Sequence, residues 1–458
     1  MDLSDRLYTR FIAGVLFPVH EYLKGHNTVK VLKALEKSER WPVEQLASYR
    51  IARLRNLLRH AHQYVPYYRN LFNDLNFNPA TVTAFEDLRR LPLLTKDIIR
   101  AHTRDLIAEN MPNLIEYSTS GSTGQPLKFY ISKERVSHDV AAKWRATRWW
   151  GVDIGDREIV AWGSPLELKA QDRVKRLRDR LLRTRLLPVV SFDKETLDHY
   201  LAEIRLARPR MMFGYPSALA HLAQRAQDRS LNMGDLGIRV IFTTSEILQP
   251  HWRNIIESIF NCPVANEYGA RDAGYIAREC PAGGMHITAE DIIVETVDER
   301  GHPMAAGEGG EVVISHLASA AFPFIRYRTG DIAVLETRLC PCGRTLPLIK
   351  EITGRTNDYL VKADGTLIHG SAFNYVIRAL EGVRSYQIIQ ENLRDIRVLI
   401  AGGPEFTDGS LSRIRTQYKK LLGEDAAIDI KRVDYISPEA SGKFRHIISK
   451  VSGSSVQR

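Results

Sequence analysis

The chain has 458 residues, a length that suggests about two to four domains, and its 44% hydrophobic and 26% charged residues are typical of a soluble globular protein. Its 64 Lys and Arg residues against 54 Asp and Glu residues give a net charge of +10, which suits an anionic small ligand, a nucleic acid or an acidic membrane. The four cysteines are too few for a secreted, disulfide-framed protein, so we expect a cytoplasmic one.

Residues 1–110 are predicted to be mainly helical. The apolar run 11–19 (FIAGVLFPV) is shorter than the roughly 20 residues of a membrane-spanning helix and lacks a small-residue cleavage site, so neither a transmembrane segment nor a signal peptide is expected. We interpret this run as a core helix, with peripheral membrane contact as the alternative. Pro66 breaks the next helical pattern, and Thr95 is placed to cap the helix that follows it.

From residue 114 the chain alternates short apolar runs with helical stretches, which predicts an α/β fold. The expected strands lie at 115–117, 158–163, 210–215, 238–244, 263–269, 291–297, 311–315 and 331–336, and the expected helices at 194–207 and 216–229. A further helix is predicted over 173–185, where seven Arg and Lys residues accompany one Asp. This basic segment is either a solvated helix face or a docking surface for an anionic partner or a membrane.

A new pattern begins at about residue 355. A hairpin is predicted around Asp364–Gly365, and a helix, a strand pair and another helix should follow it. About 100 residues remain from this point, which is enough for a small domain. The predicted fold class is therefore α/β, with a large domain of mixed sheets and helices over 1–354 and a small α+β domain over 355–458.

Four motifs carry the chemistry. The loop in 117–129 (YSTSGSTGQPLKF) is either a phosphate cradle or a flexible linker when taken alone. The segments 267–272 (EYGARD), 327–331 (YRTGD) and 441–445 (SGKFR) then add an aromatic residue, two acids and a lysine. Together these groups suit an ATP site, with amides and hydroxyls for phosphates, an aromatic ring for adenine, and acids for ribose and Mg²⁺.

In this order the motifs resemble those of the adenylate-forming superfamily, and in particular its phenylacetate–CoA ligase branch. Residues 120–126 (SGSTGQP) are similar to the family's phosphate loop, and 60–72 (HAHQYVPYYRNLF) and 91–100 (LPLLTKDIIR) look like the N-terminal signature of the branch. The resemblance implies a large adenylation domain, binding ATP and carboxylate, and a mobile C-terminal lid.

The resemblance also implies roles for individual residues. The phosphate loop would comprise Ser120, Gly121, Ser122, Thr123 and Gly124, and Lys128 lies one place beyond the position where the family commonly has a lysine. Tyr268 would stack on adenine, near Ser245, Glu246, Asn266, Glu267 and Gly269. Asp272, where the family usually has Glu, would help to hold Mg²⁺, and Asp331 would bind the ribose hydroxyls.

The remaining roles concern the hinge and the acid. Arg355 would open the hinge between the domains, where Asn357 replaces a common Asp, and Lys443 would reach the carboxylate and the α-phosphate. The acid pocket is expected near Phe213, Tyr215, Pro216 and Thr244. The two aromatic residues would favour a flat acyl group, or they simply pack in the core.

The function implied is ATP-dependent activation of a carboxylic acid to an acyl adenylate, followed by transfer to CoA. One alternative is transfer to an amine, for example in surface-polysaccharide biosynthesis, and another is a non-catalytic nucleotide-binding relative. A nucleic-acid partner is not expected, because no RNA or DNA module is recognisable. The resemblance is compatible with a homodimer.

Cysteine and histidine occur in two compact pairs, Cys280 with His286 and Cys340 with Cys342. Three thiolates and an imidazole suit tetrahedral Zn²⁺, and matching clusters occur in the branch that the chain resembles. We therefore expect a structural zinc site that joins two loops, with two turns holding reduced thiols as the alternative. Cys262 is interpreted as an ordinary core residue.

Overall fold

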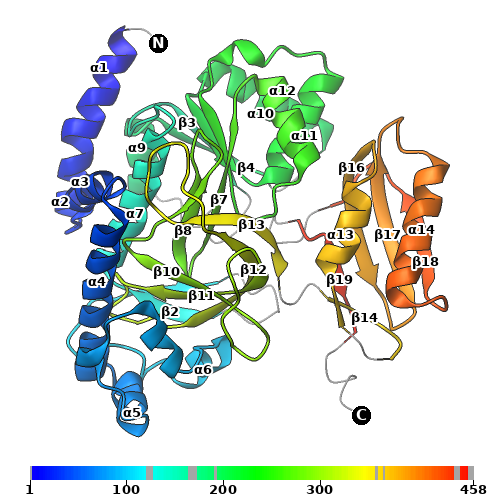
Figure 1. The fold of residues 1–458 in the computed structure, drawn as a ribbon. Helices are drawn as coiled ribbons and strands as arrows, with labels where there is room; N and C mark the ends of the chain where they lie inside the picture. The colour runs from blue at the N-terminus through cyan, green and yellow to red at the C-terminus, as the bar shows by residue number, and fades with distance from the viewer. Residues whose placement is uncertain are drawn as a thin grey trace.

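The computed structural model describes residues 3–119, 127–162, 173–189, 193–355, 359–364, 367–437 and 444–451. A large N-terminal part is built around an 11-stranded sheet, and a smaller C-terminal part has its own 4-stranded sheet and lies to one side of it (Figure 1). The predicted class, a large α/β part followed by a small α+β part, is confirmed.

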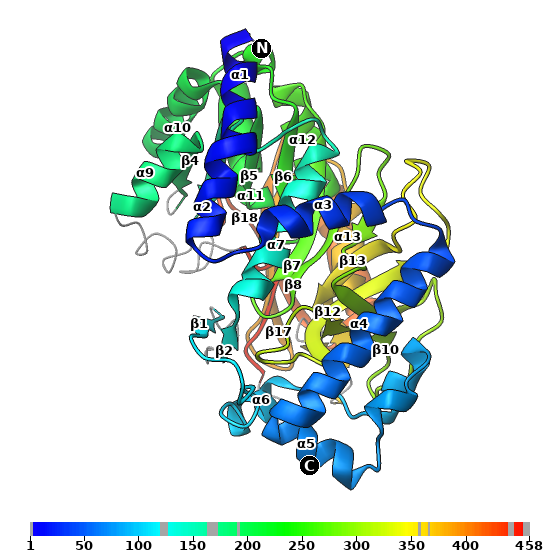
Figure 2. The ribbon, with the colours of Figure 1, turned by 90° about the vertical axis from the view of Figure 1, so that its left-hand side faces the viewer.

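The first hundred residues are helical, as predicted, and form the outer layer seen in Figure 2. Thr95 caps α6, because its Oγ1 accepts a hydrogen bond from the Ile98 N–H at 3.2 Å. Val65 adopts an extended conformation before Pro66, which separates α4 from α5. The helices of this layer are α1 (Leu3–Phe11), η1 (Ile12–Leu16), α2 (Phe17–Leu23), α3 (Thr28–Ser38), α4 (Val43–Tyr64), α5 (Pro66–Asp74), η2 (Pro79–Thr81), η3 (Phe85–Arg90) and α6 (Lys96–Ala101).

One half of the large sheet is parallel, in the order β4-β3-β5-β6-β7. Its strand residues alternate between two cores: Met212 and Ile241 face the helices α10–α12, and Met211 and Val240 face α3 and α7. The elements are α7 (Lys133–Arg148), β3 (Glu158–Trp162), β4 (Thr184–Pro188), α10 (Lys194–Ala207), β5 (Met211–Gly214), α11 (Pro216–Asp228), η4 (Gly234–Leu236), β6 (Val240–Thr243), α12 (Pro250–Phe260) and β7 (Val264–Ala270).

The other half is antiparallel, in the order β7-β8-β9-β13-β12-β11-β10, so that β7 belongs to both halves. Helices α4 to α6 pack against this half. Its strands are β8 (Gly274–Glu279), β9 (Met285–Ile287), β10 (Ile292–Val297), β11 (Gly309–His316), β12 (Tyr327–Glu336) and β13 (Leu348–Arg355). A separate antiparallel hairpin, β1 (Ile115–Ser118) with β2 (Lys128–Ile131), flanks residues 120–126.

The C-terminal part packs two helices on a sheet of order β18-β17-β16-β19. It contacts the large part through Arg384, whose carbonyl accepts a hydrogen bond from Trp252 Nε1 at 2.9 Å, and through Phe444, which packs in the core around α11 and α12. Its elements are β14 (Tyr359–Val361), β15 (Leu367–His369), α13 (Gly370–Arg378), β16 (Val383–Gln390), β17 (Asp395–Gly402), α14 (Asp408–Leu422), β18 (Ala427–Arg432) and β19 (Ile447–Ser449).

Two expectations are corrected by the structure. The helix predicted over 173–185 is too long: α9 (Arg173–Leu181) ends before Arg183, whose φ of 58° is left-handed, and Thr184 begins β4. The run 11–19 is not a core helix on all sides. Ile12 and Phe17 are buried, whereas Phe11 remains 54% exposed. Among the described residues, no helix combines the length and the apolar character that crossing a membrane requires.

Candidate functional site

The predicted nucleotide residues meet where the sheet changes from parallel to antiparallel. Asn266 pairs with Thr243 of the parallel neighbour β6, and Tyr268 pairs with Ala277 of the antiparallel neighbour β8. Tyr268 donates its phenolic hydrogen to Asp331 on β12 at 3.0 Å. Burial, reinforced by the Asp331 carboxylate, raises the pKa of Tyr268 well above its usual range, so the hydroxyl stays protonated and remains a donor.

Asp272 lies beside this pair, immediately after β7. It is 5% exposed, and its carboxylate accepts hydrogen bonds from the Tyr327 hydroxyl at 2.5 Å and from the Ala273 N–H at 3.1 Å. The buried Arg135 donates to the Asp272 backbone carbonyl at 2.7 Å, which fixes the turn that carries this carboxylate. Each carboxylate oxygen has two lone pairs, so both oxygens keep acceptor capacity for another ligand.

The carboxyl ends of β5 and β6 lie at the same edge, where ligands of open α/β sheets commonly bind. Ser245 has a φ of 71°, an uncommon conformation for a residue other than glycine, and the sharp turn precedes Glu246. The Glu246 carboxylate accepts hydrogen bonds from the Ser217 N–H and hydroxyl, both at 3.1 Å, and from the Phe444 N–H at 2.6 Å. One carboxylate therefore connects α11, the β6 turn and the C-terminal part.

Not every predicted residue joins this cluster. Glu267 forms a buried ion pair with Arg278, and strand alternation directs it away from the face of Tyr268. Close packing explains why residue 269 is a glycine, because a Cβ there would lie 2.6 Å from the Gly274 carbonyl oxygen across the hairpin. Asn266 accepts from the Thr243 hydroxyl at 3.4 Å, opposite the last residue of β6.

The expected acid pocket is an aromatic group centred on Trp162, which the sequence did not single out. Its ring stacks on Phe213 at a centroid distance of 5.7 Å and lies 4.4 Å from the ring of Tyr215. Tyr215 is fully buried and Phe213 is half-buried. Pro216 begins α11, and Thr244 donates its N–H to the Gly214 carbonyl at 3.1 Å.

Several expected residues lie outside the described part of the chain: Ser120, Gly121, Ser122, Thr123, Gly124, Asn357 and Lys443. Their neighbours are described. Lys128 is exposed and pairs with Glu116 at 3.2 Å on the hairpin that flanks the Ser/Thr/Gly loop. Arg355 is the register partner of Asp331 between β13 and β12, so the expected hinge begins directly opposite that acid.

The Cys/His cluster forms at the base of the antiparallel half. The ligand atoms of Cys280, His286, Cys340 and Cys342 all lie within 4.8 Å of one another, with 3.6 Å between the sulfurs of Cys280 and Cys340 and 3.2 Å from His286 Nε2 to Cys342 Sγ. Bond lengths of tetrahedral Zn²⁺ to sulfur and nitrogen imply donor separations of about 3.5–3.8 Å, so the four donors fit this metal.

The groups around these donors favour metal binding. Burial lowers the pKa of His286 to about 4, so its imidazole is neutral at pH 7, which is the form that binds metals. Its Nδ1 lies 3.3 Å from the Leu346 carbonyl oxygen, which orients Nε2 towards the sulfurs. Burial raises the pKa of Cys262, outside the cluster, to about 12, as expected for a core thiol.

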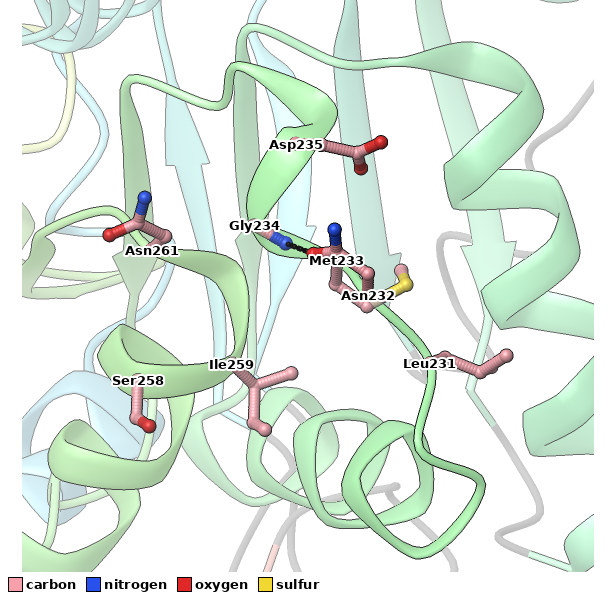
Figure 3. A pocket seen from close by; sticks show the side chains of 8 residues that line it. All are labelled: Leu231, Asn232, Met233, Gly234, Asp235, Ser258, Ile259 and Asn261. Carbon is pink, nitrogen blue, oxygen red and sulfur yellow. Dashed lines mark hydrogen bonds between the residues drawn. The ribbon is translucent and has the colours of Figure 1, made fainter.

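A surface hollow of about 540 Å³ lies elsewhere, between the 231–235 segment and the end of α12 (Figure 3). The Asn232 side chain accepts from the Gly234 N–H at 3.0 Å within it. Because β6 and β7 begin after these segments, the hollow sits at the amino ends of the parallel strands, opposite the edge that holds Glu246. Its lining residues include no aromatic or basic side chain, and none of the predicted nucleotide residues is among them.

Four residues of the candidate site were not predicted from the sequence: Tyr327, Arg135, Ser217 and Trp162. Tyr327 lay within the motif YRTGD, but the register shift between Arg328 and Ile332 carries no signal in that motif. Arg135, Ser217 and Trp162 carry no local signal, because their roles come from contacts with residues 29 to 137 positions away or from packing across adjacent strands.

Comparisons with known proteins first define the class. The fold superposes on 2-hydroxyisobutyryl-CoA ligase in the postadenylation state with R3-HIB-AMP, with a TM-score of 0.73 over 92% of each chain and 20% identity. For the same ligase in the thioesterification state with 2-HIB-AMP and CoA, the TM-score is 0.62 over 90% of this chain and 91% of that one, at 21% identity. The fold is that of the adenylate-forming ligases.

Sequence relatives narrow the class. The chain is 24% identical to Protein CapK of Staphylococcus aureus over 84% of this chain and 85% of that protein. It is 28% identical to the phenylacetate-coenzyme A ligase of Escherichia coli over 89% and 96%, and 27% identical to that of Thermus thermophilus over 77% and 79%. Residues 360–450 match the CapK C-terminal domain model. The chain thus has the fold of the adenylate-forming ligases and a sequence similar to phenylacetate–CoA ligases, as its motifs predicted.

Proposed function

We propose that this protein activates a small carboxylic acid with ATP and then transfers the acyl group to the thiol of CoA, in the cytoplasm, where ATP, CoA and reduced thiols coexist. The phenylacetate-coenzyme A ligases at 27–28% identity and the shared ligase fold support this proposal. The domain boundary at residues 354–355 is part of it, with the C-terminal domain moving between the two half-reactions.

The observation that carries the proposal is the Glu246 contact between the two parts of the chain. Phe444 donates its N–H to Glu246 at 2.6 Å, and Phe444 directly follows Lys443. The contact holds Phe444 at the carboxyl ends of β5 and β6, the edge that also bears Asp331 and Asp272, and the proposal assigns the action of Lys443 to this edge. A lysine brought there by a separate domain can be withdrawn after adenylation.

The chemistry explains why these groups are needed. In adenylation a carboxylate oxygen attacks the α-phosphorus of ATP, an acyl adenylate forms and pyrophosphate leaves. Two anions must approach each other, so the ammonium of Lys443 would stabilise the transition state by its charge. Asp331, held by the Tyr268 hydroxyl, would accept hydrogen bonds from the ribose hydroxyls, and the loop Ser120–Gly124 would bind the phosphates.

The metals have separate roles in the proposal. The buried carboxylate of Asp272 keeps lone pairs for Mg²⁺, which when bound would offset phosphate charge. Cys280, His286, Cys340 and Cys342 would hold a structural Zn²⁺ with four protein ligands and no open position, joining the loop after β8 to the loop before β13. Phe213, stacked on Trp162, is the aromatic side chain that a flat acyl group would meet.

The decisive experiment incubates the purified protein with Mg²⁺, ATP and panels of aromatic, fatty, amino and sugar acids. Hydroxylamine traps activated acyl groups, and AMP release is measured with and without CoA. We expect a hydroxamate that depends on one acid, becomes a thioester when CoA is present, and disappears in Lys443→Ala but persists in the exposed control Lys431→Ala. No acid-dependent AMP from any panel would refute the proposal.

A second candidate function differs in the molecule that accepts the acyl group. Residues 360–450 match the CapK C-terminal domain model, and in the proposal this segment would take part in the acceptor step. Acyl transfer to an amine is therefore the second candidate. Acid-dependent hydroxamate without thioester formation would select it, and amino sugars and amino acids would be tested next as acceptors.

A further inference from the structure

The N-terminal helix presents an apolar stripe to the outside of the molecule. The stripe consists of Leu3, Leu7, Phe11, Val15, Val19, Tyr22 and Leu23, which are 49% to 81% exposed. Six of these residues recur at intervals of four. At Gly14, on the same stretch, an added Cβ would meet nothing within 4 Å, so the outer side of the helix is open.

The stripe stays on one side because the helix contains a π turn. In a regular α-helix a spacing of four residues advances by about 40° per step, so the stripe would wind around the helix over 20 residues. The wider turn at Ile12–Leu16 reduces this advance. Pro18, which has no N–H to donate, follows directly and is accommodated in α2.

The opposite side of the helix is fixed to the protein. Ile12 and Phe17 are buried in a core with residues of α3, α7 and β6, and the rings of Phe17 and Trp144 lie 6.5 Å apart. The helix therefore does not need to fold or detach in order to expose its stripe. It stands at the left edge of the molecule in Figure 1 and on the side that faces the viewer in Figure 2.

Charge distinguishes the surface around the stripe. Arg6, Arg10 and Lys24 are exposed on the helix. The acids of the same helix are neutralised: Asp5 pairs with Arg157 at 2.7 Å and with Arg183 at 3.1 Å, and Glu21 is 4% exposed. The exposed side chains of the helix are thus apolar or basic, with Ser4 as the remaining polar one.

Helix α9 extends this surface. The Tyr8 hydroxyl donates to the Leu181 carbonyl at 2.9 Å, and the Arg183 guanidinium lies 3.8 Å from the ring of Tyr8, so α9 is attached to α1. Leu177 and Leu181 are 60% and 40% exposed, and Arg180 is exposed beside them. Figure 2 shows α9 beside the helix formed by α1 and α2.

We propose that the stripe and α9 form a docking surface for a membrane that contains anionic lipids. An apolar helix face flanked by Lys and Arg residues is the arrangement of helices that lie in a membrane interface, with the apolar face among the acyl chains and the cations at anionic headgroups. A two-fold dimer through the same stripe would instead bring Arg6, Arg10 and Lys24 of both copies into one interface, without exposed acids on the described helix to pair them. The docking surface is independent of the ligase reaction.

The test is flotation of the purified full-length protein with vesicles of phosphatidylcholine alone or with one third phosphatidylglycerol. We expect binding to the anionic vesicles and at least about tenfold weaker binding to the neutral ones. Leu7→Ser/Phe11→Ser should weaken binding about tenfold or more, and so should Arg6→Glu/Arg10→Glu. Two matched controls, Leu206→Ser/Leu339→Ser and Arg413→Glu/Arg415→Glu, change exposed residues elsewhere and should bind like the wild type.

Three results would overturn the proposal. One is wild-type protein that stays in the soluble fraction with both vesicles, and another is equal binding of Leu7→Ser/Phe11→Ser and the wild type. The third is light scattering that shows a dimer which Leu7→Ser/Phe11→Ser dissociates, because the stripe would then be covered by a second copy. Thermal unfolding of each variant near the wild-type midpoint verifies that the comparison is made between folded proteins.

Discussion

The two halves of the large sheet support the site in different ways. The parallel half is largely apolar on both faces and contributes Thr244 and Glu246 from the turn just beyond β6. The antiparallel half contributes residues within its strands, such as Tyr327, which donates to Asp272, and Asp331, which accepts from Tyr268. The turn after β6 can therefore contact the C-terminal part through Glu246. A residue within a strand, such as Tyr268, is instead held in one orientation by its neighbours.

The buried interiors differ as well. Behind the antiparallel half lies a network of buried charges in which Asp291 pairs with Arg53 and with His138 at 2.8 Å, and Glu290 pairs with Arg145 at 2.7 Å. Buried ion pairs are costly to break because the remaining partner is left unpaired. Both halves have apolar cores, and the antiparallel half adds this network of buried ion pairs to its core.

The largest effect is expected at Asp272. Replacing it by Asn removes the charge that we assign to Mg²⁺ and keeps an acceptor for the Tyr327 hydroxyl. Hydroxamate formation should fall about 10³-fold, equivalent to about 4 kcal/mol, with little change in the melting temperature. The control Asp235→Asn lies in the hollow at the opposite edge of the sheet and should leave the rate within about twofold. Equal rates for both variants would contradict the proposed role.

The Cys/His cluster should contribute to stability through the loops of the antiparallel half. We expect metal analysis to find about one zinc ion per chain, and a chelator or Cys340→Ala to lower the free energy of unfolding by about 3 kcal/mol. Cys262→Ala, in the core of the parallel half, should cost about 1 kcal/mol and leave the metal content unchanged. If the protein contains no metal and the chelator has no effect on urea unfolding, the two loops are held by packing alone.

Variants of Asp331 and Tyr268 test two roles separately, the charge of the Asp331 carboxylate and the Tyr268 hydroxyl that orients this carboxylate. Asp331→Ala should weaken ATP binding about 30-fold, because hydrogen bonds to a charged group contribute about 1.5–3 kcal/mol. Tyr268→Phe keeps the ring and removes only the hydrogen bond at 3.0 Å, so about a threefold loss is expected. Titration calorimetry with ATP measures both. A larger loss in Tyr268→Phe than in Asp331→Ala would reverse the assignment.

The smallest effect is a dependence of stability on pH. Burial lowers the pKa of His316, on β11, below its usual value of 6.5. The unfolded chain then binds the proton at a higher pH than the folded chain, so stability is complete above about pH 6.5 and declines as the pH falls towards the folded pKa. Between pH 7 and 5.5 the loss should be about 1 kcal/mol. His316→Asn should reduce the slope in urea unfolding, whereas the exposed His302→Asn should not.

Much of the fold followed from local patterns. Helices α10 and α11, the strands β3 and β5 to β7, and the cap at Thr95 were predicted almost to the residue, because apolar periodicity and capping act over a few positions. The helix over 173–185 was predicted too long, since Arg and Leu favour helix and nothing local announced that Arg185 to Leu187 would pair with Ile159 to Ala161.

The sequence by itself determined the order of the motifs, and with it the class of ligase, because residue types such as those of YRTGD and EYGARD carry their chemistry wherever they lie. Only the tertiary structure decided which of them meet. Tyr268 and Asp331 are 63 positions apart and Glu246 and Phe444 are 198 apart, and pairings at such separations depend on strand order rather than on local sequence. The exposed stripe of the first helix was decided in the same way, because periodicity predicts an apolar face but only packing determines whether that face is covered.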